Sequence, residues 1–171
     1  MSRPHATRTW FFLIALVVLV VDRLSKWTIA SQVHLHENLS VIPGFFRITH
    51  VQNRGAAFGL LSESPATWTL GALILFSLIA LVVVSLLLWK NSNAVTWTGV
   101  GLALVLGGTL GNLWDRLADG HVIDFLDFSL WGYHWPAFNA ADTAIVAGAL
   151  LLVVEIVFAR PPARKKAVNP R

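Results

Sequence analysis

Residues 94–116 read AVTWTGVGLALVLGGTLGNLWDR, an apolar stretch that ends in the polar motif Gly111-Asn-Leu-Trp-Asp-Arg116. A helix needs about 20 mostly apolar residues to cross a bilayer, and residues 94–114 provide that length. Small residues recur at every fourth position, namely at Gly99, Ala103, Gly107 and Gly111. Such a stripe allows a second helix to approach closely. The stretch therefore predicts a membrane-spanning helix with a packing face and a polar outer end.

The composition of the whole chain agrees with a membrane location. Of its 171 residues, 56% are hydrophobic and 13% are charged, whereas soluble domains carry about 25% charged residues. There is no cysteine, which excludes disulfides, thiolate metal sites and a cysteine nucleophile. The net charge of +4 is concentrated at the chain ends, where it sets membrane topology, so we expect no nucleic-acid partner.

Three further apolar segments are long enough to cross a bilayer. With the first stretch, the predicted spans are about 10–30, 66–89, 94–114 and 139–159. We expect an all-α membrane protein with four transmembrane helices and a small β-rich region outside the membrane. Residues 1–160 form its single domain, and residues 161–171 form a basic tail.

Basic residues fix the expected orientation of these spans. They precede the first span, lie between the second and third, and follow the fourth, at Arg3, Arg8, Lys90, Arg160, Arg164, Lys165, Lys166 and Arg171. The positive-inside rule makes this side cytoplasmic. Both termini are then cytoplasmic, and the longer connections 32–65 and 115–138 face outward.

The first outward connection contains a turn signal, Pro43-Gly44, between two segments rich in β-branched and aromatic residues. This pattern predicts a hairpin or small sheet on the membrane surface. The connection continues into Asn53-Arg-Gly-Ala-Ala-Phe58. Gly55 permits a tight turn or a close backbone approach to a ligand. An ordinary re-entry turn explains the same residues equally well.

Acidic residues are scarce, yet five of the nine lie at one rim of the predicted membrane region. They are Asp115, Asp119, Asp124, Asp127 and Asp142. Ionisable groups in or near a membrane are costly and usually mark function. Asp124 has apolar neighbours, so partial burial would raise its pKa; the alternative is a surface loop acid. Asp142 follows Asn139 by three residues, which suits a helix cap, a catalytic acid or both.

The remaining acids are predicted to have supporting or solvated positions. Asp115 shares the outer end of the third span with Asn112 and Arg116, in a polar and partly paired cluster. Asp22 and Lys26 are spaced to pair along the first helix, and we interpret them as structural support. Asp119 and Asp127 are predicted to be solvated loop acids.

These acids indicate aspartic acid–base chemistry. Two carboxyl groups close together share a proton; one activates water while the other polarises a peptide carbonyl. The sequence has no His-Glu-x-x-His pattern, no glycine-rich phosphate loop and no Gly-x-Ser-x-Gly elbow. We therefore expect neither a metal nor a cofactor.

Five motifs, in order along the chain, resemble the signature segments of bacterial lipoprotein signal peptidase (signal peptidase II). They are Asp22-Arg-Leu-Ser-Lys26, Asn53-Arg-Gly-Ala-Ala-Phe58, Gly111-Asn-Leu-Trp-Asp-Arg116, Val122-Ile-Asp124-Phe and Phe138-Asn-Ala-Ala-Asp142. The resemblance covers nearly the whole chain and implies an aspartic endopeptidase of the bacterial inner membrane, with its active site near the outer leaflet. Asp124 and Asp142 match the family's catalytic pair.

The resemblance also implies the partners and the supporting residues. The implied substrate is a prolipoprotein that is cut just before a diacylglyceryl-modified cysteine, and membrane lipid surrounds both proteins. The implied inhibitors are globomycin-type peptides. Four amide or guanidinium side chains match positions that line the site: Asn53, Asn112, Arg116 and Asn139. Asp22, Lys26 and Asp115 match motif positions in the first and third spans. Two other hypotheses stay open: a small proton-coupled transporter subunit and a non-enzymatic assembly factor.

Overall fold

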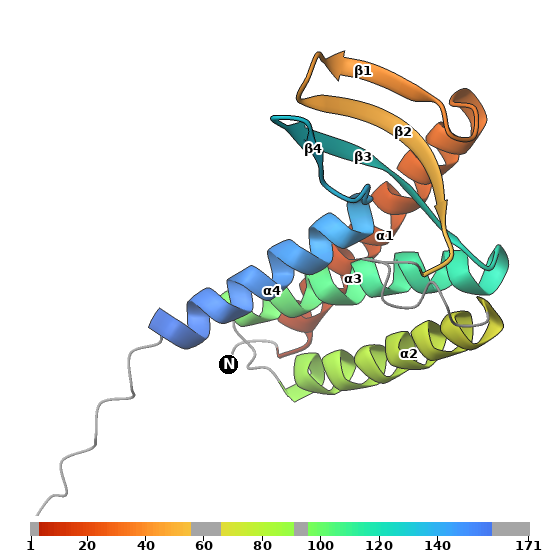
Figure 1. Cartoon of the computed structure of the whole chain (residues 1–171). Helices are drawn as coiled ribbons and strands as arrows, with labels where there is room; N and C mark the ends of the chain where they lie inside the picture. Colours follow the sequence, from red (N-terminus) through yellow and green to blue (C-terminus); the bar gives the residue numbers. More distant parts are fainter. Residues whose placement is uncertain (1–3, 56–65, 91–95, 159–171) are drawn as a thin grey trace, which may run out of the picture.

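The computed structural model describes residues 4–55, 66–90 and 96–158. Within them lie four helices and four strands (Figure 1). In chain order they are α1 (Pro4–Gln32), β1 (Asn38–Ile42), β2 (Phe46–Asn53), α2 (Ala66–Lys90), α3 (Trp97–Ala118), β3 (Val122–Leu130), β4 (Tyr133–His134) and α4 (Ala140–Phe158). The predicted tail 161–171 and the last three residues of the motif 53–58 lie outside the described residues.

The four helices lie at the positions predicted for them, with shifts at their ends. Two of them, Thr67–Lys90 and Ala140–Phe158, are long and apolar enough to cross a membrane by length and composition. Both expose large apolar side chains, such as Phe76 and Ile156, and extensive exposed apolar surface marks contact with a membrane or partner. The other two helices are less uniformly apolar because they carry buried polar side chains, such as Asp22 and Asn112.

Helix α3 is the centre of the helical layer and packs against α1, α2 and α4. Its small residues make these contacts possible. A Cβ atom added at Gly107 would lie 2.5 Å from the carbonyl oxygen of Ala15 in α1. One added at Gly101 would lie 2.9 Å from the carbonyl oxygen of Gly148 in α4. The contact at Gly107 shows that the predicted small-residue stripe packs on α1, whereas Gly101 is a close contact outside the stripe.

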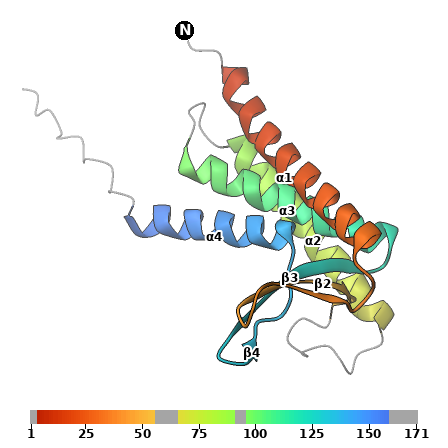
Figure 2. The same ribbon diagram turned by 90° about the horizontal axis from the view of Figure 1, so that it is seen from above.

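The strands form one antiparallel sheet in the order β1-β2-β3-β4 at one end of the helices (Figures 1 and 2). The predicted hairpin at Pro43-Gly44 is confirmed, and Gly44 has the positive φ of 74° that such a turn favours. Strand β3 from the second outward connection pairs with β2 from the first. Phe125 of β3 also packs on Ile29 of α1 and on Val33, which directly follows that helix. This contact holds the sheet against the helices.

Candidate active site

Asp124 lies on β3 with its carboxyl group held between two amides. Its Oδ2 atom accepts a hydrogen bond of 2.9 Å from Asn53 Nδ2. Its Oδ1 atom accepts one of 2.6 Å from Asn139 Nδ2. Only 3% of the residue is exposed, so the burial expected from its apolar neighbours is confirmed.

Burial also changes the acidity of this group. Desolvation, with a smaller contribution from the negative charge of Asp142, raises the pKa of Asp124 to about 6. The two amide hydrogen bonds and the charge of Lys26 oppose that rise. A carboxyl group with such a pKa can hold a proton in mildly acidic conditions and release it near neutrality.

Asp142 lies in the first turn of α4 and forms a reciprocal cap with Asn139. The backbone N–H of Asp142 donates to Asn139 Oδ1 at 3.0 Å. The backbone N–H of Asn139 donates to Asp142 Oδ2 at 3.3 Å. This is the capping-box arrangement, in which two unpaired donors of a helix start are satisfied together. The predicted cap is therefore present, and Asn139 contacts both Asp124 and Asp142.

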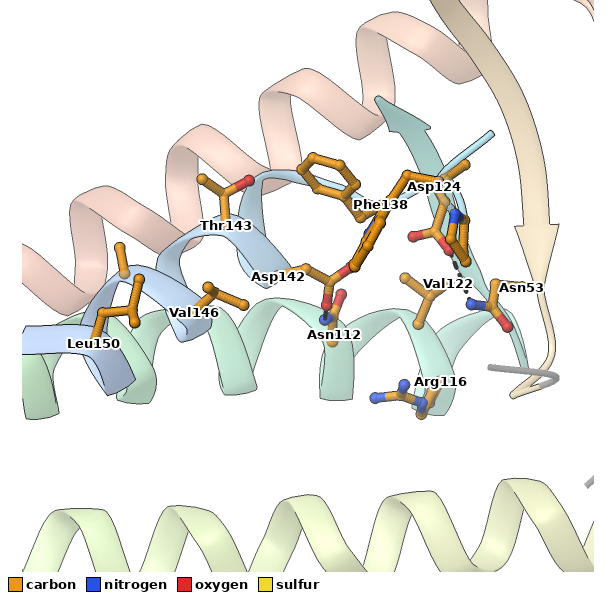
Figure 3. Close-up of a pocket in the computed structure, with 14 residues that line it drawn as sticks. Asn53, Asn112, Arg116, Val122, Asp124, Phe138, Asp142, Thr143, Val146 and Leu150 are labelled. Carbon is orange, nitrogen blue, oxygen red and sulfur yellow. Dashed lines mark hydrogen bonds between the residues drawn. The ribbon is translucent and has the colours of Figure 1, made fainter. Parts of the chain in front are cut away.

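The other oxygen of Asp142 is held from α3. Asn112 Nδ2 donates to Asp142 Oδ1 at 2.7 Å, as Figure 3 shows. Asn112 Oδ1 accepts from Lys26 Nζ at 2.8 Å. An amide whose two ends are both engaged has a fixed orientation, so Lys26 determines which end of Asn112 faces Asp142.

Lys26 belongs to a buried charge cluster between α1 and α3. Its Nζ atom lies 2.8 Å from Asp22 Oδ2 and 2.7 Å from Asp115 Oδ2. Asp115 is also paired with Arg23, whose guanidinium lies over the ring of Trp114. The predicted pairing of Asp22 with Lys26 is confirmed. Asp115 was predicted to cluster with Arg116 of its own helix, but the cations that pair with it are Arg23 and Lys26 of α1.

Asp22 links this cluster to the start of α4. Its Oδ1 atom accepts a hydrogen bond of 2.9 Å from the backbone N–H of Ala141. A Cβ atom added at Gly111 would lie 2.5 Å from Asp22 Oδ2, so glycine is needed for this close approach. The cluster therefore fixes the helix start that carries Asp142.

Gly55 supports the site through its backbone. Its N–H donates to Asn53 Oδ1 at 2.8 Å, which leaves the Asn53 amide nitrogen directed at Asp124. Its φ is +102°, and an added Cβ atom would lie 2.5 Å from Leu73 Cδ1. The structure thus favours the tight-turn interpretation of Gly55.

The two carboxyl groups line one cavity of about 630 Å³. Asn53 and Asn112 also line it, and Val146, Ala147 and Leu150 of α4 form an apolar part. Arg116 is half-buried in the same lining and supplies a cation beside the acids (Figure 3). Among the described residues, no group of three or more His, Asp or Glu side chains is arranged to hold a metal ion.

The two predicted loop acids have different surroundings. Asp119 is exposed after the end of α3, as expected. The prediction that Asp127 is solvated is wrong, because only 5% of that residue is exposed. Asp127 lies opposite Arg47 in the strand pairing and contacts both Arg47 and His134. The pairing of two outward connections into one sheet buries it, and no local pattern showed that pairing.

Sequence reasoning also missed three contributors to the site region. Arg23 was not assigned a role, although it follows Asp22 directly in the first motif. Trp135 and Pro136 line the cavity, but no role in a site was predicted for either residue. The signal for Arg23 was its basic charge within an apolar helix.

Comparisons with known proteins agree with these observations. A family model described as Signal peptidase (SPase) II matches residues 14–158. A lipoprotein signal peptidase of Syntrophus aciditrophicus is 46% identical over 150 residues, which cover 86% of this chain and 91% of the relative. One of Solibacter usitatus is 38% identical over 156 residues, covering 91% and 93%.

A solved structure described as a bacterial membrane enzyme superposes with a TM-score of 0.79 at 30% identity. The superposition covers 94% of this chain and 95% of that chain. Motifs, fold and relatives therefore lead to one assignment: the chain belongs to the signal peptidase II family.

Proposed function

We propose that the protein is a membrane aspartic endopeptidase that removes the signal peptide from diacylglyceryl-modified prolipoproteins. Cleavage occurs just before the lipid-modified cysteine. The observation that supports the catalytic assignment is the shared contact of Asn139 with Asp124 and Asp142, at a cavity lined by both acids. The relatives' name, lipoprotein signal peptidase, supports the substrate class.

The proposed reaction is the acid-assisted addition of water to a peptide carbonyl. One carboxylate of the pair takes a proton from water as the water oxygen bonds to the carbonyl carbon. The protonated partner hydrogen-bonds to the carbonyl oxygen. The C–N bond then breaks, and a proton passes to the leaving amine, so the products are a carboxylate on the signal peptide and the amino group of the cysteine. The pair therefore starts and ends the cycle with one shared proton, and it carries the second proton, taken from water, until the leaving amine receives it.

The surrounding residues are proposed to position the pair and the substrate backbone. Asn53 donates to Asp124 Oδ2, and Asn112 donates to Asp142 Oδ1. Arg116 lines the same cavity, where its guanidinium can donate to substrate carbonyl groups. Asp22, Lys26 and Asp115 hold the ends of α1, α3 and α4 together. These assignments extend the roles that the family resemblance implies.

The proposed location follows from the same framework. All four helices cross the bacterial inner membrane, with both termini cytoplasmic and the sheet outside. Residues 1–160 are one peptidase domain, and residues 161–171 are its basic cytoplasmic tail. The cavity then opens near the outer leaflet, where the lipid-bearing end of the substrate lies. Globomycin-type peptides are expected to occupy this cavity. A transporter role is not favoured, because the chain belongs to a peptidase family.

The proposal is tested with purified protein in detergent and a diacylglyceryl-modified prolipoprotein. Asp124→Asn and Asp142→Asn should each abolish cleavage, because the amide cannot exchange the shared proton. The matched control is Asp119→Asn, which changes an exposed acid outside the cavity and should cleave at the wild-type rate. Wild-type cleavage by either dyad variant refutes the catalytic pair, and loss of wild-type activity to a chelator refutes the metal-free mechanism.

A further inference from the structure

A second cavity lies on α4 at the end far from the sheet. It measures about 340 Å³ and is lined by Trp97, Leu151, Val154, Glu155 and Phe158. Glu155 is half-buried there, and its Oε2 atom accepts a hydrogen bond from the Thr98 hydroxyl of α3. Among the described residues, the ion pairs involve Asp22, Asp115 and Asp127, and none involves Glu155. The cavity therefore combines apolar walls with one oriented acid.

The two cavities follow one another along the same helix. Together they are lined by nine residues of α4, namely 142, 143, 146, 147, 150, 151, 154, 155 and 158. These positions are two neighbouring rows with a spacing of four residues, and a groove between such rows is where another helix packs. The linings of the two cavities together form a helix-binding track along α4 from Asp142 to Glu155.

The length of this track matches a signal peptide. Asp142 and Glu155 are 13 positions apart, which at a rise of 1.5 Å per residue is about 20 Å. A signal peptide has an apolar segment of about 7–15 residues after a positively charged n-region, and as a helix that segment spans about 10–22 Å. With the scissile bond at Asp142, the basic n-region of such a peptide reaches the level of Glu155.

We propose that Glu155 binds a lysine or arginine of the substrate's n-region while the apolar segment lies along α4. This inference rests on the proposed function and adds a specificity determinant at the opposite end of the substrate from the scissile bond. The chemistry is a carboxylate facing an ammonium or guanidinium group within an apolar surround, where ion pairs are screened less than in water. Thr98 orients the carboxylate for this contact.

The test uses the full chain in lipid nanodiscs with two prolipoprotein substrates, one with a basic n-region and one with those residues changed to glutamine. Glu155→Gln should raise KM about fivefold for the basic substrate, which corresponds to one partly exposed ion pair. It should leave kcat unchanged, because Glu155 is far from the reacting bond. The KM difference between wild type and variant should vanish with the neutral substrate. Asp119→Asn is the matched acid-to-amide control and should behave as wild type with both.

Two further measurements sharpen the test. Glu155→Lys paired with an acidic n-region should restore the lower KM, whereas the same variant with a basic n-region should not. Four leucines added to the apolar segment move the n-region by about 6 Å along a helix, and the effect of Glu155→Gln should then shrink.

The outcomes separate the two proposals. If wild type cleaves neither substrate, the proposed function itself fails. If wild type cleaves both with equal KM, the function stands and the n-region contact is refuted. An equal rise in KM for both substrates also refutes it, because Glu155 would then bind a lipid amine, the chain's own tail or only the Thr98 hydroxyl.

Discussion

Lys26→Met is the substitution expected to damage the protein most without touching the cavity. Lys26 is 1% exposed, and its two acidic partners, Asp22 and Asp115, are 0% and 1% exposed. Removing one partner of a buried pair costs about 3–5 kcal/mol, because the remaining charge is left uncompensated. Lys26 contacts two acids, although Arg23 still pairs with Asp115. The expected loss is therefore within that range and not twice as large.

The loss is measurable as a shift of thermal unfolding in detergent. For chains of this size, 1 kcal/mol corresponds to about 2–4 °C in Tm, so the variant should unfold at least about 6 °C below wild type. The signal can be tryptophan fluorescence, since the chain has eight tryptophans. Lys90→Met is the matched control: Lys90 is exposed at the end of α2, and its replacement should change Tm by less than 2 °C, roughly the surface-substitution range.

A second variant tests the cause of the loss. Asp22→Asn combined with Lys26→Met removes the cation and one of the acids it neutralises, so it should be more stable than Lys26→Met alone. A Tm within 2 °C of wild type for Lys26→Met would refute the electrostatic account of the α1–α3 junction. A double variant with a lower Tm than Lys26→Met would also refute it, because the two substitutions would then destabilise the protein additively.

Two further predictions concern the proposed catalytic pair, Asp124 and Asp142. The pKa of Asp124 near 6 means that the shared proton is present below this pH and lost above it, so kcat/KM should fall on the alkaline side with an apparent pKa of about 6. A profile that is flat from pH 5 to 8 contradicts this assignment. Asn139→Ala should lower Tm through loss of the cap, at about 1 kcal/mol, and lower kcat/KM about tenfold or more through loss of the donor to Asp124. Asn139→Asp should keep the cap and lose the activity; equal activity of Asn139→Asp and wild type would show that the amide donor is dispensable.

Much of the fold was predictable because its signals are local. Apolar length located all four helices, and Pro43-Gly44 located the first hairpin. The joining of β2 to β3 was not predictable, because it depends on two segments about 70 residues apart meeting outside the helices. The wrong prediction for Asp127 has the same origin: the residue looks solvated until Arg47 is brought opposite it.

The motifs named residues that the structure places around one cavity, but not the hydrogen bonds between them. Motif positions identified Asn53, Asn112 and Asn139, yet nothing in one sequence showed which oxygen each amide would contact. The Asp142–Asn139 cap is an exception, since a spacing of three at a helix start implies reciprocal hydrogen bonds. The ion pairs between α1 and α3 form only because these two helices are in contact. The stripe at Gly107 and Gly111 predicted that a helix would approach α3, but not which one.

Among the described residues, the side-chain hydrogen bonds to Asp124 and Asp142 come from amides and not from cations. An ammonium in direct contact would favour the ionised form and lower a carboxyl pKa, which would remove the shared proton. Asn53 and Asn139 instead orient Asp124 while its burial keeps the pKa raised. Lys26 lies one amide further away and reaches Asp142 only through Asn112. The structure thus separates two electrostatic environments: charge compensation at the helix junction, and neutral hydrogen-bond donors at the two acids, as the proposed proton-sharing pair requires.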